Sequence, residues 1–422
     1  MDFFANLTKA PDDPILHLIQ EYKKDPNPSK VDLSVGAYYN AEGKAENLES
    51  VNLAQKALAQ YYYSLPTENA LAPVDLTLSS KVAKDINISY LPSTGYKGFN
   101  LAFRDFVFPE SLAARKANRI RTVETIAGSG GLRLVGEFLK QHLELETIYI
   151  SNPTWSNHFA IFETAGLKTA EYRYYNAQQR GIDFAAVLED LEKLTSKDAV
   201  LLQAACHNPT GYDFSPEQWK EVLTKIKEKG AFPVFDFAYQ GFGAGLDEDA
   251  YSVRLATEIF EQALIISSCS KNFGLYGDRT GAIHILAANE KDLDLVVSNL
   301  QFDANNFYVS PGNNGAFIVA TILKNPDLYA LWVEEVAQIR ARIASMRQQL
   351  ADLMAAQGFD FNFVVQQKGM FSYTGFTSQE VNRLKDEFSI YIVSNGRMNI
   401  AGLNEKNIDY VAKAFAKVLA DR

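Results

Sequence analysis

A lysine stands directly after an apolar run in the segment 264–271, which reads Leu-Ile-Ile-Ser-Ser-Cys-Ser-Lys. Lys271 is therefore expected at the end of a strand, where parallel sheets bind their ligands. An amine at this place can form an imine with a carbonyl compound if partial burial or a nearby cation lowers its pKa. Arg279 is a candidate cation, and it can also hold a phosphate together with the Ser268 hydroxyl. The alternative is a surface lysine in a glycine-containing loop.

An aspartate lies between two phenylalanines at the end of another apolar run, Phe235-Asp236-Phe237. A carboxylate in such surroundings is costly unless a cation accompanies it. A pyridinium N–H is a suitable cation, and a carboxylate beside it keeps the ring protonated as an electron sink. Tyr239 follows closely enough to donate to an oxygen of the same ring. The alternative is an aspartate that only caps a turn.

The segment His207-Asn208-Pro209-Thr210-Gly211 predicts a tight turn after a third apolar run. Asn208 can donate to an oxygen at the strand end. His207 has no partners at the spacing of a metal site, so we expect a structural histidine with satisfied hydrogen bonds and predict no metal site.

A glycine-rich segment, 127–133, lies between a strand-like and a helical stretch. Gly128 and Ser129 let backbone amides approach an anion at the start of a helix. The dinucleotide pattern G-x-G-x-x-G is not met, because Arg133 occupies the position of the third glycine. A single phosphate is therefore the better prediction.

Two further segments carry residues that can orient a ligand. Trp155 is expected to begin a helix and can stack on a planar ring, although a core tryptophan is the alternative. His158 can orient a carboxylate such as that of Asp236. Arg397 follows a short strand and a glycine, and its guanidinium can present a fork to a carboxylate.

Strand-like and helical stretches alternate through the middle of the chain, which predicts an α/β fold with a mostly parallel, buried sheet. Ser215-Pro216 is a helix start with an N-cap serine and a proline at the first helical position. Beyond Pro311-Gly312 the pattern predicts a second, α+β unit. The expected strands of the first part are 123–126, 147–151, 200–205, 232–237, 264–268 and 282–286, with helices at 132–143 and 155–165. The second part is expected to hold a helix over 326–357, strands around 361–365, 369–374 and 391–393, and a helix over 408–419.

Composition excludes several classes of protein. The 422 residues are 47% hydrophobic and 22% charged, with a formal net charge of -10. This negative charge argues against nucleic-acid or anionic-membrane binding, both of which need a basic surface. No apolar run approaches the ~18 residues that span a bilayer, and no signal peptide is evident. A soluble protein in the reducing cytoplasm, with two buried thiols, Cys206 and Cys269, is the simplest expectation.

Together these segments resemble the class I aminotransferases, specifically the subgroup of aspartate and aromatic amino acid aminotransferases. The resemblance runs in order over nearly the whole chain, and its most specific parts are 270–276 and 207–211. It implies pyridoxal 5'-phosphate as the cofactor and fold type I, with a large domain whose mostly parallel sheet is flanked by helices and a smaller α+β domain. The expected division is an N-terminal arm with part of the small domain (1–50), a cofactor-binding domain (51–311), and an interdomain helix with the small domain (312–422).

The resemblance also implies a role for each matching residue. Lys271 is the Schiff-base lysine and the acid and base of the 1,3-prototropic shift, and Asp236 pairs with the pyridine nitrogen. The remaining cofactor ligands are Tyr239 and Asn208 on the ring oxygen, Trp155 on the ring face, His158 behind Asp236, and Ser268, Arg279, Gly128 and Ser129 on the phosphate.

The substrate residues implied are Arg397, as the clamp on the α-carboxylate, with Gly36 and Phe371 lining the site. Tyr90 resembles a phosphate ligand that the other subunit of a homodimer donates, so the active sites are shared. The resemblance implies an amino acid and a 2-oxo acid as alternating substrates of a ping-pong mechanism.

Two positions depart from the family pattern. Ala127 replaces a phosphate-binding serine, which is a modest loss. Asn305 stands where aspartate aminotransferases carry the arginine that binds the substrate's side-chain carboxylate, so we expect a preference for aromatic or other neutral side chains. The alternatives are an aspartate aminotransferase in which Lys97 or another cation compensates, a lyase on the same fold, and a binding protein without activity.

Overall fold

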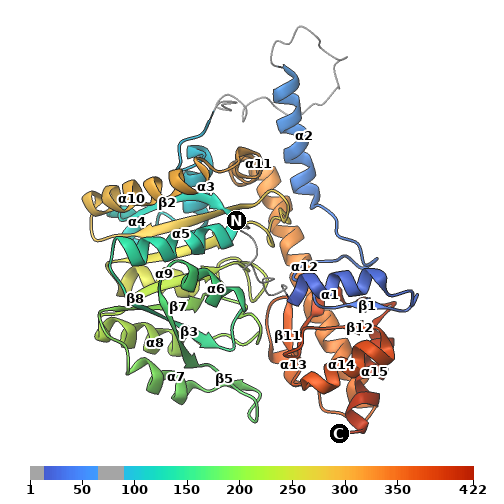
Figure 1. The fold of residues 1–422 in the computed structure, drawn as a ribbon. Coiled ribbons are helices and arrows are strands. Elements are labelled where there is room, and N and C mark those ends of the chain that lie inside the picture. The colour runs from blue at the N-terminus through green and yellow to red at the C-terminus, as the bar shows by residue number, and fades with distance from the viewer. Residues whose placement is uncertain (1–13, 65–89) are drawn as a thin grey trace, which may run out of the picture. The chain divides into compact units, whose positions relative to one another are not determined.

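The computed structural model describes residues 14–64 and 90–422. The chain divides into two compact units. The large unit comprises Glu46–Arg342 and Gln367–Gly369, and the small unit comprises Met1–Ala45, Ile343–Gln366 and Met370–Arg422. Each unit is described separately below (Figure 1).

A seven-stranded sheet in the order β2-β10-β9-β8-β7-β3-β4 forms the centre of the large unit. Its strands are β2 (Ile120–Ile126), β3 (Thr147–Asn152), β4 (Lys168–Arg173), β7 (Asp198–Gln203), β8 (Phe232–Phe237), β9 (Ala263–Ser268) and β10 (Thr280–Leu286). The helices of this unit are α2 (Glu49–Ser64), α3 (Lys97–Val107), α4 (Ala113–Lys116), α5 (Ala127–Gln141), α6 (Asn157–Thr164), α7 (Phe184–Leu191), α8 (Pro216–Lys229), α9 (Tyr251–Ile259), α10 (Glu290–Tyr308), α11 (Asn313–Lys324) and the first part of α12 (Pro326–Ala356). A short hairpin, β5 (Tyr175–Asn176) and β6 (Gly181–Ile182), completes it.

The sheet is mostly parallel. Strands β4, β3, β7, β8 and β9 pair in parallel, whereas β10 pairs antiparallel with both β9 and β2. Strand β2 therefore runs in the same direction as β9, and the first residue of β10 lies at the sheet edge where the other strands end. The predicted α/β fold class with a mostly parallel sheet is confirmed.

Helices cover both faces of this sheet. Successive side chains of a strand point to opposite faces, and Ile266 of β9 lies against Gly131 of α5, where an added Cβ would approach it to 2.8 Å. Ile265 points the other way and shares its face with its register partners Phe235 and His284. The Trp219 ring of α8 packs near Phe235, and the Phe103 ring of α3 packs on His284, so α3 and α8 lie opposite α5. Every residue of β7, β9 and β10 is buried, as expected for a sheet covered on both faces.

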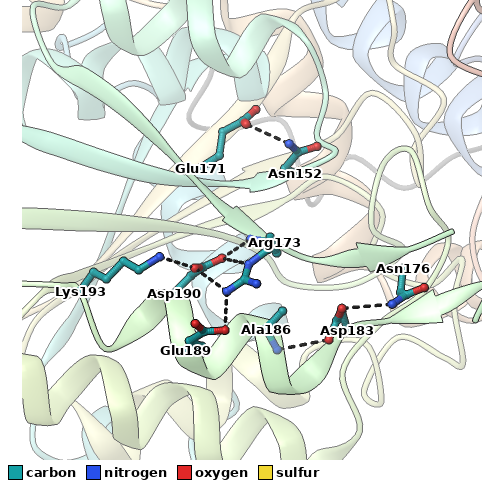
Figure 2. A network of polar contacts seen from close by, with 9 residues as sticks. All are labelled: Asn152, Glu171, Arg173, Asn176, Asp183, Ala186, Glu189, Asp190 and Lys193. Carbon is teal, nitrogen blue, oxygen red and sulfur yellow. Dashed lines mark hydrogen bonds and ion pairs between the residues drawn. The ribbon is translucent and has the colours of Figure 1, made fainter. Parts of the chain in front are cut away.

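Figure 2 shows the polar network that ties α7 to the edge strand β4. Asp190 of α7 accepts hydrogen bonds from the backbone N–H and the guanidinium of Arg173 at 2.8 to 2.9 Å, and from Lys193 at 2.6 Å. These hydrogen bonds, that from Arg173 above all, hold the pKa of Asp190 well below its usual range. Asn152, at the end of β3, donates to Glu171 of β4 at 2.9 Å. The network therefore fixes the sheet edge beside the loop that follows β3.

The small unit contains two short sheets and their covering helices. Strand β1 (Val31–Asp32) pairs in parallel with β12 (Ile390–Tyr391), so the N-terminal segment joins the C-terminal one. Strand β11 (Phe371–Tyr373) pairs antiparallel with β13 (Arg397–Asn399). The other elements are α1 (Pro14–Lys24), the end of α12, α13 (Phe363–Gln366), α14 (Ser378–Phe388), the 3-10 turn η1 (Ile400–Gly402) and α15 (Ile408–Ala420).

Three local predictions were wrong. The expected strand at 361–365 is the short helix α13, because a short apolar run fits either structure and its surroundings decide between them. The glycines after β2 lie inside the first turn of α5, which begins at Ala127, rather than in a loop before the helix. Trp155 precedes α6, which begins at Asn157. By contrast, the predicted start of α8 is confirmed, and Ser215 forms a capping box with Gln218.

Within the described ranges, no single helix combines the length and apolar character needed to cross a membrane. The neighbouring helices α11 and α12 pass the same test only when taken together across a bend of 101°.

A buried glutamate on β2 makes the stability of the large unit depend on pH. Glu124 is 1% exposed, and its Oε2 accepts the Tyr96 N–H at 2.8 Å, while Oε1 has no hydrogen-bond partner among the described residues. Burial raises the pKa of Glu124 from its ordinary 4.5 to about 8. Between these values the folded chain holds a proton that the unfolded chain releases, so the free energy of unfolding falls as pH rises through this window.

Replacing Glu124 with glutamine removes this titration and keeps an acceptor for Tyr96. We expect E124Q to be stabilised by about 2–4 kcal/mol relative to the unchanged protein at pH 8.5, and by much less at pH 5. Denaturant unfolding at the two pH values measures the difference. E137Q is the control, because the Glu137 carboxylate is paired with Arg133. An equal effect of E124Q at both pH values would contradict the prediction.

Candidate functional site

One edge of the large sheet collects the predicted cofactor residues. Strands β2, β3, β7, β8 and β9 end at this edge, and the antiparallel strand β10 begins there. Each predicted cofactor residue except Tyr90 lies at, or within a few positions of, one of these strand termini. They are Gly128 and Ser129 after β2, Trp155 and His158 after β3, Asn208 after β7, Asp236 and Tyr239 at and after the end of β8, Ser268 and Lys271 at and after the end of β9, and Arg279 before β10.

The start of α5 and Arg279 form an anion cradle. Helix α5 has no side-chain cap, so the amides that follow Ala127 in its first turn are available to an anion, which the helix dipole also favours. The Arg279 guanidinium donates to the Ser129 hydroxyl at 3.2 Å. A Cβ added to Gly128 would lie 3.3 Å from the Cβ of Ser268, so glycine lets the helix start approach the end of β9.

The backbone around this cradle is strained. Ala127 and Arg279 both adopt positive φ, at 54° and 55°, and the Ala127 N–H donates to the Arg279 carbonyl at 2.9 Å. A Cβ at Gly281 would come within 2.6 Å of the Ala127 backbone, so the two segments touch. Left-handed non-glycine residues cost free energy and concentrate at functional sites.

A chain of hydrogen bonds supports Asp236. Nε2 of His158 lies 3.1 Å from Oδ2 of Asp236, and Nδ1 of His158 lies 2.8 Å from the Thr154 hydroxyl. His158 is fully buried, while the Asp236 side chain retains 12% exposure. The Trp155 ring meets the His158 ring edge-on at 5.3 Å. The Asp236 carboxylate is therefore fixed by His158 on one side and remains partly accessible at the edge of the sheet where the strands end.

Lys271 lies close to Tyr239. Its Nζ is 5.0 Å from the centre of the Tyr239 ring, a distance at which an ammonium is attracted to the ring face. The segment after the lysine is anchored in the core, since Phe273 stacks on Trp332 at 4.4 Å and the Trp332 indole donates to the Asn272 carbonyl at 2.8 Å. Lys271 thus extends from a rigid segment.

The turn that carries Asn208 is held by two residues that sequence analysis missed. Gln203 contacts both the N–H and the carbonyl of Asn208. Asp213 accepts the N–H groups of Cys206 and His207 at 2.8 and 2.9 Å. No local pattern in the sequence distinguishes either residue from other polar residues near apolar runs.

His207 is the predicted structural histidine. Its ring nitrogens lie 2.9 Å from the hydroxyls of Ser151 and Thr210, and the ring stacks on Tyr174 at 4.0 Å. Burial, with a smaller effect from nearby His158, lowers the pKa of His207 to about 3. The ring is therefore neutral at physiological pH.

The small unit brings Arg397, Phe371 and Gly36 together. The Arg397 guanidinium lies 4.3 Å from the Phe371 ring centre and donates to the Ser34 carbonyl at 2.6 Å. A Cβ at Gly36 would lie 3.1 Å from the Phe371 ring. Asn399 holds the segment around Gly36 by donating to the carbonyls on both sides of it, at 2.7 Å each.

Tyr90 and Asn305, which were also predicted as site residues, lie on the surface. Tyr90 is 84% exposed, and Asn305 is exposed on α10, where its Oδ1 is 3.5 Å from the Ser93 hydroxyl.

The groups at the sheet edge match the functional groups of pyridoxal phosphate. The cradle suits its phosphate, Asp236 suits a protonated ring nitrogen, Asn208 and Tyr239 suit the ring oxygen, and Lys271 suits the aldehyde. A mostly parallel sheet with this set of groups at its ligand-binding edge defines a pyridoxal-phosphate-dependent enzyme of fold type I.

Comparison with known proteins gives the family. The model of "aminotransferase class I and II" matches residues 28–415, and the chain belongs to this family. It is 39% identical over 421 residues to an aspartate aminotransferase of Pseudomonas aeruginosa, covering 99% of this chain and 100% of the relative. It is 40% identical over 423 residues to an aromatic-amino-acid aminotransferase of the same organism, covering 100% of both.

Solved structures agree. An aromatic-amino-acid aminotransferase from Burkholderia pseudomallei, covalently bound to pyridoxal phosphate, superposes with a TM-score of 0.91 at 36% identity, covering 99% of this chain and 100% of that one. The cytoplasmic aspartate aminotransferase of Saccharomyces cerevisiae superposes with a TM-score of 0.90 at 33% identity, covering 99% of both chains. The protein is a pyridoxal-phosphate-dependent aminotransferase that works by the family's ping-pong mechanism.

Proposed function

We propose that Lys271 binds the cofactor covalently and moves the proton in amino transfer. Pyridoxal phosphate, when bound, supplies a ring that withdraws electrons from the α-carbon of the amino acid. Nζ of Lys271 then takes the proton from that α-carbon and returns it at the C4′ carbon. The observation that carries this role is the position of Lys271, three residues beyond β9 and beside Tyr239, at the edge that also presents Asp236.

The other large-unit residues bind and orient. Asp236, supported by His158, holds the ring nitrogen, and Asn208 and Tyr239 donate to the ring oxygen. Trp155 covers the ring face. The phosphate is held by Arg279, Ser268, Gly128 and Ser129, which form or adjoin the cradle at the start of α5.

In the small unit we propose Arg397 as the ligand of the substrate's α-carboxylate, with Gly36 and Phe371 shaping its surroundings. Arg397 is 4% exposed, and its guanidinium is oriented by the Ser34 carbonyl and the Phe371 ring. A fixed guanidinium binds a carboxylate with two parallel hydrogen bonds.

We further propose a homodimer whose subunits share active sites, with Tyr90 and Asn305 reaching the partner's site. Both residues are exposed, and α10 also exposes Phe302, Phe307 and, just beyond its end, Val309. Exposed apolar groups of this kind mark interaction surfaces. Sedimentation equilibrium tests the assembly, and a monomer at micromolar concentration would contradict it.

The substrate preference is proposed from Asn305. An amide cannot neutralise a second carboxylate, and the loss of a charge-assisted pair costs on the order of 1.5–3 kcal/mol. Discrimination against aspartate by about 10-fold to 150-fold follows. We therefore propose an aromatic or other neutral amino acid as the preferred donor and a 2-oxo acid as the acceptor.

A half-reaction without keto acid tests this preference. Conversion of the bound cofactor to its pyridoxamine form should be faster with phenylalanine and tryptophan than with aspartate. N305R should raise kcat/KM for aspartate by about 10-fold to 100-fold. N306R, at the neighbouring exposed position, is the matched control and should leave the ratio unchanged. Equal or faster conversion with aspartate in the unchanged protein would contradict the proposal.

The second candidate is an aspartate aminotransferase that uses L-aspartate and 2-oxoglutarate, in which Lys97 or another cation replaces the missing arginine. It is favoured by the relatives named aspartate aminotransferase, and the same half-reaction distinguishes it. A lyase would instead release ammonia without accumulating the pyridoxamine form.

Two organisational points are proposals as well. We place the cofactor-binding domain at 51–311, between an N-terminal segment (1–50) and an interdomain helix with the small domain (312–422). We propose a cytoplasmic location, in keeping with the acidic net charge and with two buried cysteines, Cys206 and Cys269, that form no disulfide.

A further inference from the structure

A buried glutamine contacts both Asn208 and the hydrogen-bond chain that ends at Asp236. Gln203 is the last residue of β7, is 8% exposed, and stands in register with Asp236 on β8. Directly opposed residues of adjacent strands point to the same face of a sheet. The Gln203 side chain therefore shares a sheet face with the carboxylate that we assign to the ring nitrogen.

The hydrogen bonds of this glutamine determine its orientation. Its Oε1 accepts the Asn208 N–H at 2.7 Å, and its Nε2 donates to the Asn208 carbonyl at 2.9 Å. If the amide were flipped, its NH₂ group would face the Asn208 N–H and its oxygen would face the Asn208 carbonyl. The Asn208 backbone therefore excludes the flipped orientation. The second N–H of Nε2 is left for the Thr154 hydroxyl oxygen at 3.2 Å. Both amide hydrogens are then used.

The orientation of the Gln203 amide determines the direction of two hydrogen bonds, from Thr154 to His158 and from His158 to Asp236. Because the Thr154 oxygen accepts from Gln203, the single hydroxyl hydrogen of Thr154 can point at Nδ1 of His158, 2.8 Å away. Nδ1 is then an acceptor, and the ring hydrogen sits on Nε2, 3.1 Å from Oδ2 of Asp236. The opposite tautomer would set the Nε2 lone pair against a carboxylate and would deprive the Thr154 hydroxyl hydrogen of Nδ1 as its acceptor.

We propose that Gln203 is a positioning residue that fixes the tautomer of His158 through Thr154, so that His158 donates from Nε2 to Asp236. The same amide holds Asn208, so one side chain coordinates the groups assigned to the ring nitrogen and to the ring oxygen. The importance of this arrangement for the cofactor rests on the proposed roles of Asp236 and Asn208. The tautomer of His158 follows from the hydrogen bonds themselves and does not require those roles.

Replacing Gln203 with glutamate reverses the relay. A carboxylate at this position accepts the Thr154 hydroxyl hydrogen, so the Thr154 oxygen becomes an acceptor towards His158. Nδ1 of His158 must then carry a hydrogen. T154V interrupts the relay at its second step and leaves the contacts between Gln203 and Asn208 in place.

Histidine-selective ¹⁵N labelling of the full chain reads the tautomer directly. The protein has five histidines, and the variant H158N identifies the signal of His158. Spectra are recorded without cofactor and again with pyridoxal phosphate. The unchanged protein should show His158 protonated at Nε2 alone. Q203E should shift the Nδ1 resonance towards the protonated position, and T154V should shift it towards the position of an unprotonated nitrogen that accepts no hydrogen bond. Q240E is the matched control, since Gln240 is 2% exposed and its amide donates to the Leu246 carbonyl.

The outcomes separate the two levels of the proposal. An unchanged His158 signal in a folded Q203E or T154V protein, or a protonated Nδ1 in the unchanged protein, would overturn the role of Gln203. A shifted His158 signal supports it. If the signal shifts but the pH dependence of the bound cofactor's visible absorption does not, Gln203 retains its role and the assignment of Asp236 to the ring nitrogen fails.

Discussion

Replacing Lys271 with alanine is expected to slow the half-reaction with L-phenylalanine by about 10⁴-fold or more. The change removes both the amine that binds the cofactor covalently and the acid and base that moves the substrate proton, and positioned proton transfer by itself contributes about 10²–10⁴-fold. The anion cradle does not include Lys271, because it consists of the α5 start, Ser129 and Arg279. Pyridoxal phosphate should therefore still bind, without a covalent bond.

The two effects can be measured separately. Reduction of the loaded protein with borohydride, followed by peptide mass analysis, should place the cofactor on Lys271 in the unchanged protein and nowhere in K271A. Stopped-flow absorbance gives the single-turnover rate constant. K271R is the matched variant, since it retains a cation near the Tyr239 ring but cannot replace the amine. Labelling of another lysine, or a K271A rate within tenfold of normal, would refute the assignment.

Replacing Asp236 with asparagine should slow the same half-reaction by about 10²–10⁴-fold. The carboxylate is 12% exposed and is held by His158, so its interaction with a cationic ring nitrogen is poorly screened. Removing one partner of a buried ion pair costs about 3–5 kcal/mol, which corresponds to this range of rates. Without the carboxylate the ring nitrogen loses its proton, and the ring withdraws electrons less strongly.

The control for D236N is D236E, which keeps the charge but moves it by one methylene. If charge is the essential property, D236E should retain more activity than D236N, although it will be impaired because His158 is fixed in place by Thr154. Thermal unfolding of the cofactor-free proteins should show that both variants fold. A D236N rate within threefold of the unchanged protein would rule out the proposed role.

The fold was largely predictable because its signals are local. The apolar run 232–237 coincides with β8, and Ser215-Pro216 marks the start of α8, since strand burial and helix capping depend on neighbouring residues. The 361–365 segment was not predictable. It is apolar and short enough for a strand or a helix, and it forms α13, whose Val364 carbonyl accepts a hydrogen bond from buried Arg347 at 3.0 Å.

The site was predictable as a set of residues but not as an arrangement. Lys271, Asp236 and Asn208 were recognisable because each follows or ends an apolar run, which is where parallel sheets bind ligands. Gln203 and Asp213 were missed, since a single polar residue in or after such a run has no distinctive local pattern. Their importance appears only through contacts with the backbone at 206–208.

The sequence by itself thus determined the identity of the reactive groups, the alternation of strands and helices, and the departure at Asn305. Only the tertiary structure decided which groups meet, because the order β9-β8-β7-β3 places residues from distant segments side by side. The contact between Gln203 and Thr154 joins positions 49 residues apart. Local propensity contains no information about such a pair, whereas sheet order and side-chain parity determine it.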